Sequence, residues 1–136
     1  MRVLRSTPHA NLINFHAFIL TPSYSLVAMD YHPQLVQVAI PESRAKIYAQ
    51  QLFSAVEHLH VHGITHNDIK PSNILLSSDD RPILIDFGFA QQWDMRSPDR
   101  FLSSLSWGTP EYLSPERAKG QLHDERLSDI WALGVS

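Results

Sequence analysis

The stretch that decides the fold is ITHNDIKPSNILLSSDDRPILIDFG, which runs from residue 64 to residue 88. Two short apolar runs within it, 74–76 and 83–85, flank a polar turn and predict a β-hairpin. If the two strands pair about that turn, Asn73 before the first strand and Asp86 after the second lie at the same open end. The hairpin therefore brings two oxygen-bearing side chains together.

These side chains suit the chemistry of phosphoryl transfer. Mg²⁺ prefers oxygen ligands, of which the protein commonly supplies one or two, and Asn73 and Asp86 could supply them. Asp68 precedes Asn73 near the same end, where its carboxylate could orient a hydroxyl nucleophile, and Lys70 adds a cation beside it. Positioning and electrostatic stabilisation are the main sources of catalysis in this reaction, so the residue types fit it.

Residues 42–62 carry the strongest helical pattern of the chain. Pro41 suits the first turn of a helix, and Gly63 just beyond the last periodic position is a natural C-terminal stop. The apolar residues recur at three- and four-residue steps, the period of one helix face. They are Ala45, Tyr48, Ala49, Leu52, Ala55, Val56 and Leu59.

Two short apolar runs precede this helix, around residues 17–20 and 25–31, and a turn-like Thr-Pro-Ser sequence separates them. They predict an antiparallel pair of strands. Together with the later hairpin and the helix, they indicate an α+β fold in one continuous unit without internal repeats.

Composition narrows the classes of function. A chain of 136 residues with 43% hydrophobic content falls in the range of one globular domain, and it contains no cysteine for disulfide or thiolate chemistry. A net charge of -3 supplies no basic field for nucleic acid, so we expect no nucleic-acid partner. No long apolar run or signal peptide is present, so we expect no membrane partner and an intracellular location, cytoplasmic or nuclear.

Four motifs in chain order resemble those of the eukaryotic-type serine/threonine protein kinase family. Residues 66–73 resemble the catalytic loop, 86–88 the magnesium-binding Asp-Phe-Gly motif, 108–116 the end of the activation segment, and 129–134 the start of the helix that anchors the catalytic loop. One such motif alone would be weak, whereas four at compatible spacings form a specific signal that covers essentially the whole chain.

The resemblance implies a partial two-lobed protein-kinase-like α+β fold across residues 1–136. Residues 1–32 would form the last strands of the N-lobe and the hinge. Residues 33–136 would form the first half of the helical C-lobe, with the catalytic loop and the activation segment. The family's activity would be transfer of the ATP γ-phosphate to serine or threonine hydroxyls of protein substrates, with Mg²⁺ as the metal.

The resemblance also implies roles at the reaction centre. Asp68 would be the catalytic base or hydroxyl-orienting group, and Lys70 would steady the transferred phosphoryl group. Asn73, a catalytic-loop residue, and Asp86 would hold Mg²⁺. Lysine two residues after the catalytic aspartate, together with Thr109, is the pattern of serine/threonine rather than tyrosine kinases.

Further positions are implied to bind the nucleotide or to support the site. For ATP, Met29 would be the gatekeeper, the backbone of Asp30 and His32 would lie near adenine, and Leu75 would form the adenine floor. Asp129 would anchor the catalytic loop by accepting backbone hydrogen bonds. The family's stacked hydrophobic column would contain His66, Phe87 and Phe15.

The chain also departs from the family pattern. Asn67 stands where most members have arginine, and it carries no charge to receive an activation-segment phosphate, so we expect little dependence on such a phosphate. The family's glycine-rich loop and phosphate-contacting lysine would precede Met1, and the arginine partner of Glu116 would follow Ser136. We therefore expect this chain by itself to be inactive or weakly active, and a non-catalytic kinase-like binding module is the alternative.

Other residues receive simpler interpretations. His58 and His62 would share a helix face, which suggests a histidine-rich metal-binding protein as a third interpretation. No nearby acid completes a metal-binding motif, which disfavours it, and zinc retained after dialysis would support it. We expect Trp107 and Trp131 to be buried aromatics. The serines at positions 103, 104 and 106 are interpreted as polar loop residues, with phosphorylation sites as the alternative.

Overall fold

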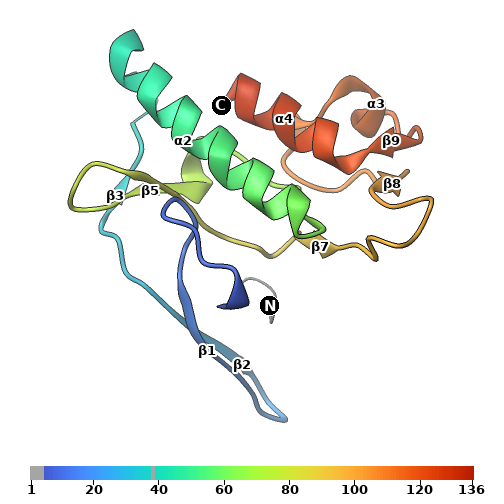
Figure 1. The fold of residues 1–136 in the computed structure, drawn as a ribbon, viewed down its shortest axis with the longest axis horizontal. Coiled ribbons are helices and arrows are strands. Elements are labelled where there is room, and N and C mark those ends of the chain that lie inside the picture. Colours follow the sequence, from blue (N-terminus) through green and yellow to red (C-terminus); the bar gives the residue numbers. More distant parts are fainter. Residues whose placement is uncertain (1–4, 38) are drawn as a thin grey trace.

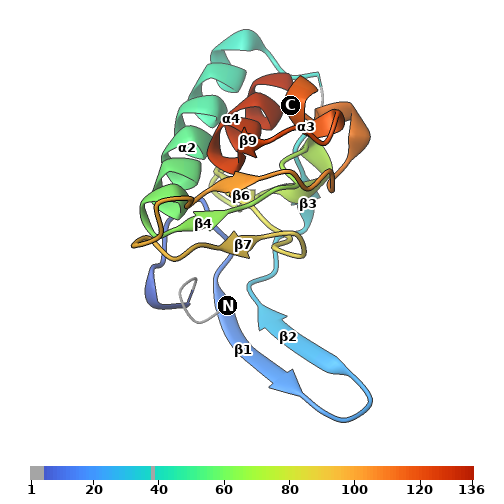
Figure 2. The same cartoon turned by 90° about the vertical axis from the view of Figure 1, so that its right-hand side faces the viewer.

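The computed structural model describes residues 5–37 and 39–136. Two helices, α2 (Glu42–Val61) and α4 (Glu125–Val135), contact each other and lie over a layer of short strands (Figures 1 and 2). Among the described residues, no helix combines the length and the apolar character that crossing a membrane requires. The mixed α+β class expected from the sequence is confirmed.

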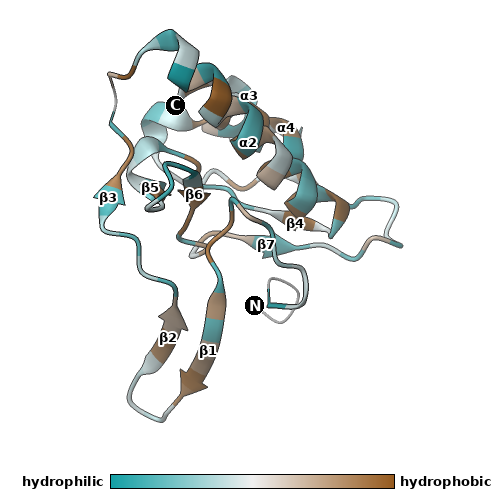
Figure 3. Cartoon of the chain, turned by 60° about the vertical axis from the view of Figure 1, so that its left-hand side comes forward, coloured by the Kyte–Doolittle hydropathy of each residue, from teal (hydrophilic) through white to brown (hydrophobic). Residues whose placement is uncertain are grey.

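A hairpin of β1 (Phe15–Leu20) and β2 (Ser25–Met29) extends away from this body, as Figure 2 shows. The strands pair antiparallel, so that prediction is confirmed, although the second strand ends two residues earlier than expected. Figure 3 shows brown, apolar sections on both strands, with teal bands between them on β1. Large apolar side chains on the hairpin, such as Ile19 and Leu26, are exposed.

The hairpin that decides the fold lies in a three-stranded sheet of order β3-β5-β6. Its strands are β5 (Ile74–Leu76) and β6 (Pro82–Leu84), and the short strand β3 (Gln34–Leu35) pairs with β5. The predicted pairing is confirmed, with the second strand one residue earlier than expected. Beyond the last pair, the Ile85 N–H donates to the Asn73 carbonyl at 2.9 Å, so Asn73 and the residue after Ile85 lie at the open end.

Two-stranded ladders attach the segment that follows this hairpin to the body. In the first, β4 pairs antiparallel with β7, and in the second, β8 pairs antiparallel with β9. Short helices η1, η2 and α3 lie in the connections. The bounds are β4 (Ile64–Thr65), η1 (Pro71–Asn73), β7 (Gln91–Gln92), β8 (Leu102–Ser103), η2 (Pro110–Tyr112), α3 (Pro115–Ala118) and β9 (His123–Asp124).

The core forms where the apolar face of α2 meets β5, β6 and α4. The face expected from the periodicity is the one that is buried, and the helix ends before Gly63, whose φ of +72° is a left-handed conformation that glycine adopts without steric cost. Burial of these side chains is the main favourable contribution to folding. The central members are Leu52, Ala55, Val56, Leu59, Ile74, Ile83, Leu84 and Leu133.

Two expectations about the C-terminal region are wrong. Helix α4 begins at Glu125, four residues before Asp129, because the Asp124 side chain caps it by accepting the Arg126 N–H at 2.9 Å. Trp131 is 45% exposed, since it lies off the buried face of α4, and Trp107 is 38% exposed in the loop before η2.

Candidate active site

Asp129 in α4 anchors the loop that carries the candidate catalytic residues. Its Oδ2 accepts the His66 N–H at 2.9 Å and its Oδ1 accepts the Asn67 N–H at 2.8 Å. Nε2 of His60 lies 3.0 Å from Oδ2, a contact that the sequence pattern did not predict. The expected contact between this aspartate and two loop amides is confirmed, and it fixes the backbone just before Asp68.

His66 supports the loop from inside the core. Burial lowers its pKa, which favours the neutral imidazole. Its Nε2 lies 2.9 Å from the Ile85 carbonyl and its Nδ1 lies 3.3 Å from the Asp68 N–H, so the network assigns the proton to Nε2. Its ring packs on Phe87 with centroids 4.8 Å apart, and Phe87 packs on Phe15 at 5.7 Å. The three side chains expected to stack are in contact.

Asp68 is the centre of a dense hydrogen-bond network. Its Oδ1 accepts the Thr109 N–H at 3.1 Å and the Thr109 hydroxyl at 2.6 Å. Its Oδ2 lies 2.8 Å from the Lys70 Nζ and accepts from the Asn73 Nδ2 at 3.0 Å. Burial alone would raise the pKa of Asp68, but the bonds from Lys70 and Thr109 outweigh it and lower the pKa. The carboxylate is therefore ionised and its direction is set by three side chains.

Asn73 and Asp86 supply oxygens that fit a hard cation. The Asn73 Nδ2 donates to the Asp68 carbonyl at 2.8 Å as well as to its side chain, which leaves Oδ1 as an acceptor. Asp86 is exposed and has φ of +60°, and its Oδ1 accepts the Gly88 N–H at 3.1 Å. One amide oxygen and one carboxylate suit Mg²⁺, whose other ligands are commonly phosphate oxygens and water.

Gly108 brings the end of the activation segment against the catalytic loop. Its φ is +112°, and a Cβ at this position would lie 2.8 Å from the Asn67 carbonyl oxygen. Only glycine allows this close approach. The next residue, Thr109, is thereby held at Asp68, and its hydroxyl also accepts a hydrogen bond from Lys70 at 2.6 Å.

The residues expected near adenine are less tightly assembled. Met29 ends β2 and is 48% exposed, whereas Leu75 lies in the other sheet, paired with Leu35 and Ile83. The Asp30 N–H donates to the Asn14 carbonyl at 3.0 Å, and His32 lies in the connection to β3. Their roles in nucleotide binding stay predictions.

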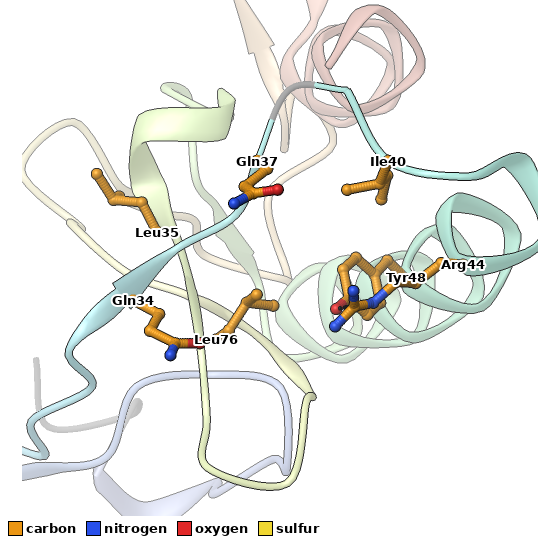
Figure 4. A pocket seen from close by; sticks show the side chains of 7 residues that line it. All are labelled: Gln34, Leu35, Gln37, Ile40, Arg44, Tyr48 and Leu76. Carbon is orange, nitrogen blue, oxygen red and sulfur yellow. Dashed lines mark hydrogen bonds between the residues drawn. The ribbon is translucent and has the colours of Figure 1, made fainter.

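A cavity of about 410 Å³ lies apart from this chemistry, between β3, β5 and the start of α2 (Figure 4). Arg44 and Tyr48 form one wall, where the Arg44 Nε donates to the Tyr48 hydroxyl at 2.8 Å, and Asp80 pairs with both side chains. The lining residues are Gln34, Leu35, Gln37, Ile40, Arg44, Tyr48 and Leu76. Since Asp68 and Asp86 do not line it, this cavity is not the candidate active site.

The serines of the activation segment differ in accessibility. Ser103 is buried in β8 and its Oγ accepts the Leu105 N–H at 3.0 Å, whereas Ser104 and Ser106 are exposed. The Asn67 side chain accepts a hydrogen bond from Arg117 in α3. The sequence motifs did not indicate Arg117 as part of the site. No local pattern could reveal this contact, because the two residues lie 50 positions apart.

Comparison with known proteins agrees with the geometry. The chain matches the family model described as protein kinase domain over residues 1–136. It is 38% identical over 105 aligned residues to serine/threonine-protein kinase AtPK1/AtPK6 of Arabidopsis thaliana, an alignment that covers 77% of this chain and 21% of that protein. Serine/threonine-protein kinase SRK2D of the same plant is 33% identical, with 97% of this chain and 38% of that protein aligned.

A further relative comes from an animal. Serine/threonine-protein kinase 36 of Pongo abelii is 34% identical, and the alignment covers 98% of this chain and 10% of that protein. The chain thus spans well under half the length of each of these three relatives.

Proposed function

This chain belongs to the protein kinase family, and from that premise we propose that its full-length protein transfers the γ-phosphate of ATP to serine and threonine hydroxyls of protein substrates. The observation that carries the proposal is the network around Asp68. An ionised carboxylate whose direction is fixed by Lys70, Asn73 and Thr109 can accept a substrate hydroxyl when that hydroxyl takes the place of one of these donors.

In this proposal Asp68 binds the attacking hydroxyl group and directs its oxygen toward the phosphorus atom. The lowered pKa of Asp68 keeps the carboxylate ionised, so it can accept a hydrogen bond from the attacking hydroxyl. As the hydroxyl oxygen forms its bond to the γ-phosphorus, the bond from that phosphorus to the β,γ-bridging oxygen breaks and ADP leaves, and the hydroxyl proton passes to Asp68. Lys70, 2.8 Å from Asp68, places positive charge where the transferred group gains negative charge.

Asn73 and Asp86 would hold magnesium through the Asn73 Oδ1 and the Asp86 carboxylate. The metal, when bound, neutralises charge on the phosphate oxygens. Because Asn73 also donates twice to Asp68, the same side chain would link the metal site to the hydroxyl site. Met29, Leu75 and the connection between β2 and β3 are proposed to bind the adenine.

Preference for serine and threonine is proposed from Lys70 and Thr109. These two side chains bond to each other at 2.6 Å and both bond to Asp68, so they limit the space around the carboxylate. The relatives named serine/threonine-protein kinases support the same preference.

The test replaces Asp68 by asparagine in the full-length protein. Asp68→Asn should remove most phosphoryl transfer and leave nucleotide affinity within a few fold, because Asp68 acts on the hydroxyl rather than on ATP. Asp94→Asn, at an exposed aspartate, is the matched control and should keep full turnover. Unchanged turnover in Asp68→Asn would remove Asp68 from the mechanism, and nucleotide binding without any transfer by the parent would favour a non-catalytic module.

A further inference from the structure

Arg117, in the short helix α3, places a charged side chain in the interior next to the catalytic loop. The residue is 2% exposed, and its Nη1 donates a hydrogen bond to Oδ1 of Asn67 at 3.1 Å. The same nitrogen lies 3.5 Å from Oε2 of Glu125, which is fully buried. A guanidinium group therefore joins α3 to the residue immediately before Asp68.

This placement is unfavourable for folding. Among the described residues, Nε and Nη2 of Arg117 have no hydrogen-bond partner. Burial raises the pKa of Glu125 even though Arg117 and His123 lower it. Burying charged groups with incomplete hydrogen bonding costs free energy, and apolar replacements of buried ion pairs are often neutral or stabilising. A contribution to folding stability therefore does not explain why a charged side chain lies here.

Asn67 is held in a conformation that few residues adopt. Its φ is +71°, in the left-handed region, and its N–H donates to Asp129. Its Nδ2 donates to the Thr65 hydroxyl and to the Phe89 carbonyl, both at 3.2 Å. Since the amide donors are used there, Oδ1 is the acceptor that faces Arg117. The guanidinium completes the hydrogen bonding of this side chain.

We propose that Arg117 is a positioning residue for Asp68. By holding the Asn67 side chain, it maintains the left-handed backbone from which the Asp68 carboxylate is directed, and it does so with a charge that the chain itself supplies. Arg117 acts through Asn67 in this account. The inference rests on the proposed kinase function, since its kinetic readout is phosphoryl transfer.

The test compares two full-length variants that both lack the buried carboxylate. Glu125→Gln keeps the contact between Arg117 and Asn67, whereas Arg117→Met/Glu125→Gln removes it without leaving an unpaired buried charge. We expect the double variant to have about one tenth of the kcat of Glu125→Gln, with the KM for ATP within about twofold. Arg96→Met, the same substitution at an exposed arginine, is the matched control and should keep the parent kcat.

A second arm asks whether the effect passes through Asn67. Asn67→Ala should lower kcat by a similar factor, and adding it to the double variant should lower kcat no further. Two losses that multiply would overturn the proposal, and so would an unchanged kcat in the folded double variant. If the double variant does not fold, Arg117→Lys replaces it, because lysine keeps the charge but lacks the planar guanidinium that places Nη1 within reach of both Asn67 and Glu125. A several-fold loss of kcat in Arg117→Lys is then expected, and an unchanged kcat would overturn the proposal.

Amide hydrogen exchange separates a failure of this inference from a failure of the proposed function. The amides of Asn67 and Asp68 should exchange faster in the double variant than in Glu125→Gln, while exchange in β5 should be equal in both. This readout requires no turnover. If the parent transfers no phosphate but the two variants still differ in exchange at Asn67 and Asp68, the result would contradict kinase activity and support the role of Arg117. Equal exchange at the loop would overturn that role, whatever the activity.

Discussion

Replacing Asp129 by alanine should destabilise the protein strongly, because this side chain is the acceptor for two buried backbone amides. The N–H groups of His66 and Asn67 donate to its two oxygens at 2.9 and 2.8 Å. A buried donor that loses its partner costs about 1–3 kcal/mol, so two such donors give about 2–6 kcal/mol. That is a large share of a typical stability of about 5–15 kcal/mol.

Asp129→Asn should lower the free energy of unfolding by less than Asp129→Ala, because one side-chain oxygen remains to accept one amide N–H while the new Nδ2 faces the other. We expect a loss of about 1–3 kcal/mol for this variant. Denaturant unfolding of the full-length protein, with equal m-values in parent and variants, measures both. Asp94→Ala, at an exposed position, should change the unfolding free energy by less than about 0.5 kcal/mol. A loss below about 1 kcal/mol for Asp129→Ala would refute the anchoring role.

Three further perturbations test the site. Asp86→Ala should weaken magnesium-dependent nucleotide binding, because it removes the anionic ligand; equal magnesium dependence in titrations of variant and parent would count against the assignment. Gly108→Ala should lower kcat, because its Cβ would lie 2.8 Å from a backbone oxygen and displace Thr109 from Asp68; a steady-state kcat equal to the parent's would show that this approach is unimportant. Because the pKa of His66 is lower in the folded than in the unfolded protein, the unfolded chain takes up the His66 proton at a higher pH. The free energy of unfolding therefore keeps its full value above the ordinary His pKa of 6.5 and decreases as the pH falls below it. His66→Phe should remove a slope of at most about 1.4 kcal/mol per pH unit there, measured by unfolding at several pH values; an unaltered slope would contradict a buried neutral imidazole.

Local patterns were enough to predict the parts of the fold that depend on neighbouring residues. The period of the apolar residues predicted α2 and the side it buries, and the polar turn predicted the pairing of β5 with β6. The position of Asn73 at the open end followed from that pairing, because strand register determines which residues share an end. Helix α4 begins at Glu125 rather than at Asp129 because the Asp124 side chain caps it, and this local capping signal lies outside the motif at 129–134.

Contacts between distant segments could not be predicted from periodicity. Thr109 bonds to Asp68 across 41 positions, and Arg117 reaches Asn67 across 50. Their geometry depends on side-chain rotamers and on the course of the activation segment, which short ladders hold against the body. The sequence resemblance indicated Thr109 as a class marker, but its two hydrogen bonds to Asp68 became visible only in the structure.

The central claim is that Asp68 directs a serine or threonine hydroxyl toward the γ-phosphate of ATP. The most direct measurement incubates the full-length protein with ATP labelled at the γ-phosphate, magnesium and a mixture of protein substrates, and then identifies the labelled amino acids after hydrolysis. The account predicts label on phosphoserine and phosphothreonine, loss of both in Asp68→Asn, and full retention in Asp94→Asn. Label on phosphotyrosine, or equal label in Asp68→Asn and the parent, would contradict it.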